Sequence, residues 1–79
     1  MPYRACWRLL GVGARLLDKG ELDGLHEHED DARAAILAQL TGFAVYGHDE
    51  QHGEWWAKRT AEADMETRFR VEPRLANTS

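Results

Sequence analysis

The chain has 79 residues, of which 43% are hydrophobic and 30% are charged, and it carries a net charge of −4 and one cysteine. This composition is typical of one small globular domain, and it excludes an intrinsically disordered chain and a disulfide-stapled scaffold. The sequence contains no signal peptide and no apolar run of about 18 residues, so we expect a cytoplasmic protein without membrane contact.

Charge is distributed unevenly along the chain. Residues 20–54 hold nine carboxylates and one arginine, whereas the segments on either side carry a small excess of cations. An acidic middle between basic ends favours intramolecular or head-to-tail pairing over a dedicated nucleic-acid surface. A domain this small buries only about 60% of the surface of its unfolded chain, so we expect self-association to supply additional burial.

Alternation of apolar and polar side chains predicts a strand over residues 3–9. One face of this strand carries Tyr3, Ala5, Trp7 and Leu9. Gly11 and Gly13 then predict a bend, and residues 14–19 form either a second strand or a short helix that ends at Gly20. Residues 18–21 and 23–24 are predicted to be turns.

An amphipathic helix is predicted from about Asp30 to Leu40. Acidic residues at its start stabilise the positive end of the helix, and Thr41 and Gly42 end it. Apolar residues recur at spacings of three and four, which gives one stripe that must pack on a sheet. The stripe consists of Ala32, Ile36, Leu40 and Phe43.

Two extended segments, residues 54–59 and 65–72, are predicted to form a C-terminal β-hairpin. Trp55 and Trp56 are adjacent in the first segment, so they must point to opposite faces of the sheet. Residues 44–46 leave room for a short apolar extension, and residues 47–53 are predicted to be a polar loop. Residues 74–79 lack any periodicity and are predicted to be a flexible tail.

These elements together predict an α+β domain over residues 1–73. We expect a small, mostly antiparallel sheet of three or four strands with one α-helix packed on one face. The predicted order is strand, uncertain second strand, helix, strand, strand.

All four histidines lie in two acidic clusters, at residues 24–31 and 48–52. Imidazoles and carboxylates are ligands for zinc, so one hypothesis is a divalent-metal site. Its ligands would be His26, His28, His48 and His52. The spacing matches no known zinc motif, and polar residues of solvated loops explain the same pattern.

Cys6 is the only thiol in the sequence, and an enzyme would use it as the nucleophile. Arg4 and Arg8 flank it in the predicted strand, and their charges could lower its pKa. A cysteine in a strand of a small domain is more often a packed apolar residue, and so small a core leaves little room for a catalytic pocket. We therefore lean against an enzyme and expect no cofactor.

A nucleic-acid hypothesis uses Trp55 or Trp56 as a stacking platform for single-stranded bases. The phosphates would then be bound by Lys58, Arg59, Arg68 and Arg70. Carboxylates interleave with these cations, so ion pairs on a solvated sheet face are the simpler interpretation.

The remaining hypothesis is a non-catalytic protein-interaction or adaptor module that binds a protein partner or forms a homodimer. A sheet with a helix on one face leaves its other face and its edge strands uncovered, and both can pair with a partner. Tryptophan and arginine are enriched at the centres of interfaces. The residues predicted for the interaction surface are Trp7, Trp55, Trp56, Arg59, Arg68 and Arg70.

Overall fold

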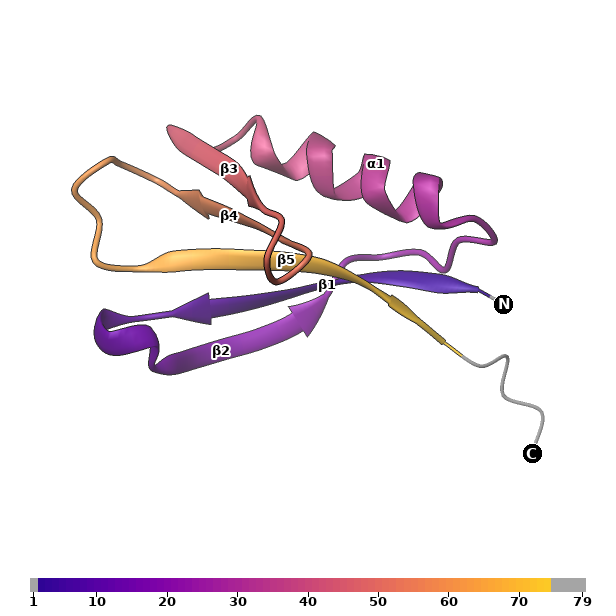
Figure 1. Ribbon diagram of the computed structural model, residues 1–79, viewed down its shortest axis with the longest axis horizontal. Coiled ribbons are helices and arrows are strands. Elements are labelled where there is room, and N and C mark those ends of the chain that lie inside the picture. The colour runs from indigo at the N-terminus through magenta and orange to yellow at the C-terminus, as the bar shows by residue number, and fades with distance from the viewer. Residues whose placement is uncertain (1, 75–79) are drawn as a thin grey trace.

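The computed structural model describes residues 2–74, and within them one helix covers one face of a five-stranded antiparallel sheet (Figure 1). The elements are β1 (Tyr3–Leu10), a 3-10 turn (Val12–Ala14), β2 (Leu16–Glu21), α1 (Glu29–Leu40), β3 (Val45–Asp49), β4 (Glu54–Lys58) and β5 (Glu66–Pro73). The strand order is β2-β1-β5-β4-β3, so the last strand of the chain lies in the middle of the sheet. The predicted α+β class is confirmed.

The predicted sheet of three or four strands is too small, because two segments that contain glycine are strands. The predicted turn at residues 18–21 belongs to β2, where Gly20 lies opposite Trp7. The predicted loop that starts at Gly47 begins inside β3, where Gly47 lies opposite Trp56. In both pairs the indole occupies the space above the glycine. Both glycines were predicted to lie in turns or loops, but each lies within a strand because a large cross-strand side chain packs over it.

The C-terminal hairpin is not confirmed in the predicted form. β4 and β5 do pair antiparallel, but only over three positions, and residues 59–65 separate them. β5 pairs with β1 over eight positions, from Tyr3 opposite Pro73 to Leu10 opposite Glu66. The C-terminal segment is thus a central strand whose longer partner comes from the start of the chain.

The predicted stripe of α1 is confirmed as the helix side of the core. Its buried residues pack against β1 and β5, and the most buried large side chains are Ile36 and Leu40. The core cluster consists of Ala5, Ile36, Leu40, Ala57 and Phe69. Phe43, the last residue of the stripe, is only half-buried and meets Phe69 edge to face at 6.1 Å.

The helix is shorter than the strands it covers. Its 12 residues span about 18 Å, whereas the eight residues of β1 or β5 span about 26 Å. The β1–β2 connection and the β4–β5 loop therefore extend past the C-terminal end of α1 (Figure 1). This difference in length leaves part of the helix side of the sheet uncovered.

Arg74 is the first residue of the predicted tail and the last residue that the structure describes. Its backbone N–H donates a hydrogen bond to the Pro2 carbonyl oxygen at 2.8 Å. The rest of the predicted tail, residues 75–79, lies outside the described residues. Among the described residues, no helix has the length and apolar character needed to cross a membrane.

Candidate functional site

The predicted interaction residues do not form one surface, because the sheet separates them. Trp7 and Trp55 pack on the helix side, against the core cluster. Trp56, Arg68 and Arg70 alternate with these positions and lie on the opposite face, which we call the open face. The sixth predicted residue, Arg59, lies on the helix side with its guanidinium over the Phe43 ring at 5.5 Å.

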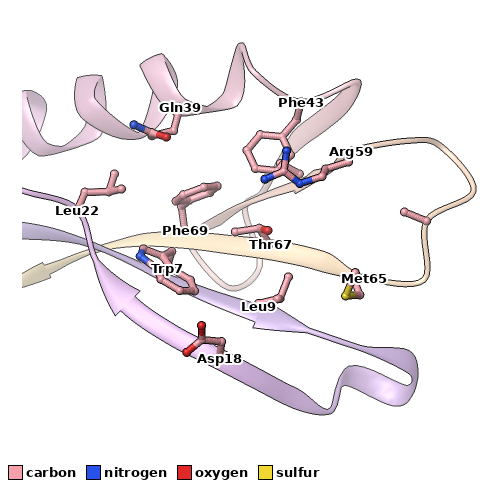
Figure 2. Close-up of a pocket in the computed structure, with 12 residues that line it drawn as sticks. Trp7, Leu9, Asp18, Leu22, Gln39, Phe43, Arg59, Met65, Thr67 and Phe69 are labelled. Carbon is pink, nitrogen blue, oxygen red and sulfur yellow. The ribbon is translucent and has the colours of Figure 1, made fainter.

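An apolar groove of about 370 Å³ lies where the helix side is uncovered (Figure 2). We call it the helix-side groove. It is lined by Trp7, Leu9, Asp18, Leu22, Gln39, Phe43, Ala57, Arg59, Ala63, Met65, Thr67 and Phe69. Its volume lies at the small end of the range of about 300–1,000 Å³ that is usual for ligand pockets.

The groove is apolar at its floor and charged at its rim. Phe69 and Trp7 lie at its base, and Phe43 closes it beneath the end of α1 (Figure 2). Asp18 comes from β2, and Arg59 is the first residue after β4, so a carboxylate and a guanidinium stand at different sides of the opening. The arrangement is suited to an apolar group that is flanked by opposite charges.

Met65 is the exposed apolar residue of this rim. Half of its surface, 51%, is accessible to solvent, although it lines the same groove as Trp7, Phe43 and Phe69. Met65 extends the apolar lining of the groove toward the solvent, and contiguous apolar surface of this kind is typical of a binding site.

The open face carries a network of ion pairs around Glu54, which is only 6% exposed. Arg8 Nη2 donates to Glu54 Oε2 at 2.6 Å, and Arg68 Nη1 donates to Glu54 Oε1 at 3.4 Å. Arg68 also donates to Glu66 at 2.6 Å and to Asp49 at 3.0 Å. Three carboxylates therefore surround one guanidinium.

Two carboxyl groups of the open face, those of Asp49 and Glu72, have lowered pKa values. Asp49 has its pKa lowered to about 2, first by the hydrogen bond with His52 and second by the hydrogen bond from Arg68. The pKa of Glu72 is also lowered, chiefly because Arg74 donates a hydrogen bond to it. Since Arg68 is already bound to carboxylates, it has less capacity for the phosphate contacts that the nucleic-acid hypothesis requires.

Cys6 lies on the open face and is almost completely buried. Burial is the main cause that raises the pKa of its thiol, and the Glu72 carboxylate raises it further. Arg74, at 3.4 Å from the sulfur, acts in the opposite direction but does not reverse the shift. A thiol with a raised pKa is a weak nucleophile at neutral pH, so this environment does not favour cysteine catalysis.

The four histidines lie at separate places in the fold. His26 forms a backbone bridge with Tyr3, and His28 precedes the first turn of α1. His48 packs on the Trp55 ring at 4.7 Å, whereas His52 Nδ1 lies 2.8 Å from Asp49. Within residues 2–74 there is no group of three or more His, Cys, Asp or Glu side chains that could hold a metal ion. The geometry therefore gives the zinc hypothesis no support.

Sequence reasoning did not find the helix-side groove. It assigned Phe43 to the buried stripe of the helix, which is incomplete because Phe43 is only half-buried and also lines the groove. The signal that could have found the groove is the length of the predicted helix, because about 11 residues cannot cover a strand of eight.

No protein-family model matches the chain, and no curated protein or solved structure matches it either. The geometry of the chain itself is therefore the basis for a functional proposal.

Proposed function

We propose that the protein is a non-catalytic interaction module that binds a segment of a partner protein in the helix-side groove. The observation that carries the proposal is the apolar groove lined by Trp7, Phe43 and Phe69, which continues to the exposed Met65. Burial of a large apolar side chain contributes about 1.5–3 kcal/mol, so one anchor residue in this groove would raise the affinity by roughly ten- to a hundredfold.

The charges at the rim define the chemistry of the partner segment. Asp18 would pair with a cation, and Arg59 would pair with a carboxylate on the other side of the anchor residue. An apolar anchor flanked by a basic and an acidic residue is therefore the ligand that fits best. The opening is too exposed for a reaction that must exclude water, and the groove offers Asp18 as its single carboxylate.

The experiment is a selection of short random peptides displayed on phage, followed by titration of the best binders into ¹⁵N-labelled protein. The three indole N–H signals report on different surfaces, because Trp7 lines the groove, Trp55 lies beside His48, and Trp56 lies on the open face. We expect the selected peptides to share a large apolar residue flanked by charges, and to shift the Trp7 signal most strongly.

The Met65→Glu variant tests the groove directly, and Leu25→Glu is its matched control. The two side chains have nearly equal exposure, 51% and 52%, but Leu25 is not part of the groove lining. We expect Met65→Glu to abolish peptide binding and Leu25→Glu to leave it unchanged. Peptides that shift only the Trp56 signal, or a selection that enriches no peptide, would refute the proposal.

A further inference from the structure

We infer that the free edge of β3 pairs antiparallel with β3 of a second copy of this chain. β3 is one of the two edge strands of the sheet, and the other is β2. An edge strand exposes unpaired backbone N–H and C=O groups that can bind another strand. The proposed dimer uses a different surface from the helix-side groove and does not depend on it.

The β2 edge is protected against such pairing. Lys19 lies in the middle of the strand, and the Asp18 carboxylate accepts a hydrogen bond from the Lys19 backbone N–H at 2.8 Å. The register between β1 and β2 also shifts at Leu9 and Leu10, which is the irregularity of a β-bulge. Lysine residues and bulges are among the devices by which natural sheets block their edges.

The β3 edge has none of these features within residues 2–74. Its sequence, Val45-Tyr46-Gly47-His48-Asp49, contains no lysine and no proline, and its register with β4 is regular. No side chain in this part of the chain accepts a hydrogen bond from the backbone of residues 45–49. Helix α1 packs mainly against β1 and β5, and Tyr46 of β3 is 51% exposed, so the helix leaves this edge accessible.

Symmetry and charge select β3 over β2 for self-pairing. Two residues that lie opposite each other in an antiparallel pair face the same side of the sheet. A two-fold axis perpendicular to the sheet keeps each residue on the same face in both copies, so only residues separated by an even number of positions can pair. The register must therefore be centred on one residue and not between two residues. Centring on Gly47 pairs all five residues of β3, with Tyr46 opposite the partner's His48 and Val45 opposite the partner's Asp49. No like charges meet in this register.

The same construction fails on β2. The two symmetric registers that pair five of its six residues are centred on Asp18 and on Lys19. The first places two carboxylates opposite each other and the second places two ammonium groups opposite each other. Like charges directly opposite destabilise a strand pair.

The position of Trp56 supplies apolar contact to the β3 pair. Its indole covers Gly47, since a Cβ on that glycine would come within 2.9 Å of three ring atoms. Centring the register on Gly47 puts two glycines side by side, with one indole reaching over them from each β4 strand. Neighbouring strands are about 4.8 Å apart, so the two β4 strands would be about 14 Å apart and the indoles would approach each other between them. Because five residues per copy make a small interface, the dimer should depend on concentration.

The first experiment measures the dimer by sedimentation equilibrium over a range of protein concentrations. The test variant is Tyr46→Lys/His48→Lys, which places lysines opposite each other, and the control is Leu16→Lys/Leu17→Lys, which adds the same charges to the β2 edge. We expect the first variant to weaken dimerisation by about tenfold or more and the control to leave it unchanged. Circular dichroism checks that both variants keep the fold of the wild type. A wild type that is monomeric at every concentration, or a dimer lost only in the β2 variant, would overturn the inference.

The second experiment tests the register by disulfide cross-linking in a Cys6→Ala background. Tyr46→Cys protein and His48→Cys protein are oxidised separately and as a mixture. Since residue 46 lies opposite residue 48 of the partner, we expect a cross-linked dimer in the mixture and not in either protein alone. Equal cross-linking of Tyr46→Cys protein with itself would exclude the register centred on Gly47.

Discussion

The Trp7 indole lies flat across Gly20, its cross-strand neighbour on β2, so closely that a Cβ on Gly20 would come within 2.6 Å of the ring atom Cζ2. This contact holds the indole on the helix side of the sheet, at the base of the groove. The absence of a side chain at Gly20 is therefore what allows Trp7 to cover the edge strand.

The Gly20→Ala variant should displace the Trp7 indole. Because the ring is large and packs against the core, we expect a loss of about 1–3 kcal/mol in the free energy of unfolding, measured by urea denaturation. The control is Gly42→Ala, where the nearest atom would be the Gln39 carbonyl oxygen at 3.5 Å. That substitution should change stability by less than about 1 kcal/mol. Equal effects of the two substitutions would show that the contact with Trp7 is not what requires a glycine.

The elements that sequence reasoning found are those in which local pattern and tertiary packing agree. The alternation at residues 3–9 and the stripe through Ile36 and Leu40 are both visible in the chain, and both face the core. β2 is exposed along nearly its whole length, so burial imposes no alternation on it. Gly20 and Gly47 were predicted to be turn or loop residues because nothing near them in the sequence indicates a packing role. The indoles that pack on them belong to residues 13 and 9 positions away in the sequence.

The candidate site was harder to predict than the fold, because a surface depends on which face each strand presents. Adjacent residues of a strand point to opposite sides, so Trp55 and Trp56 were correctly expected to separate. The prediction that both tryptophans share one surface with Trp7, Arg59, Arg68 and Arg70 was not confirmed. To know which of these residues lie together, one must know the order of the strands in the sheet. That order depends on β5 pairing with β1, a contact between the two ends of the chain that no local pattern encodes.

Truncation of Ile36, which is completely buried, should lower the free energy of unfolding strongly. Truncation of its neighbour Leu37, which is 49% exposed, should hardly change it. We expect Ile36→Ala to cost about 2–5 kcal/mol and Ile36→Val about 0.5–1.5 kcal/mol, because each leaves a cavity of different size. Leu37→Ala should cost less than about 0.5 kcal/mol. Chemical denaturation measures the stability of all three variants. If Ile36→Ala does not fold, Ile36→Val can still be compared with Leu37→Ala.

A similar loss in Leu37→Ala and Ile36→Val would contradict this assignment of the buried stripe. It would mean that Leu37 is covered in solution, for example by a partner molecule. Leu37 could be covered by a second copy of the chain or by its own chain. Repeating the measurement at several protein concentrations separates these two explanations, because only association makes the stability depend on concentration.

Acid should weaken the fold through Asp49. Its folded-state pKa of about 2 lies below the ordinary value of 3.8, so the ionised carboxylate stabilises the folded state. That contribution is complete above the ordinary pKa and is lost as the pH falls from about 4 to about 2. We expect Asp49→Asn to be less stable than the wild type at pH 7, and the difference should disappear near pH 2.

Thermal unfolding at pH 7, 4 and 2 measures this dependence, with Glu50→Gln as the control. Glu50 is the exposed neighbour of Asp49 and has no ion pair within residues 2–74. Its substitution should leave the pH dependence of the wild type unchanged. If Asp49→Asn remained less stable than the wild type by the same amount at pH 2, the effect would come from the shape of the side chain and not from its charge.

The ion-pair network on the open face should depend most strongly on Glu54. This carboxylate is buried between Arg8 and Arg68, with Arg70 at 3.8 Å, so removing its charge leaves three guanidinium groups close together without their shared partner. We expect Glu54→Gln to reduce the free energy of unfolding by about 1–3 kcal/mol, which is below the cost for a fully buried pair because the arginines are partly solvated. Urea denaturation in low salt measures the loss.

The matched control for Glu54→Gln is Glu29→Gln, which removes the same charge from an exposed pair with Arg33 on α1. An exposed pair of this spacing contributes only about 0.3–0.5 kcal/mol and is screened by salt. The effect at Glu54 should therefore be larger, and it should persist in high salt because water has little access to that carboxylate. If salt removed both effects equally, Glu54 would behave as a surface charge, and the open face would be held together by its strand pairing alone.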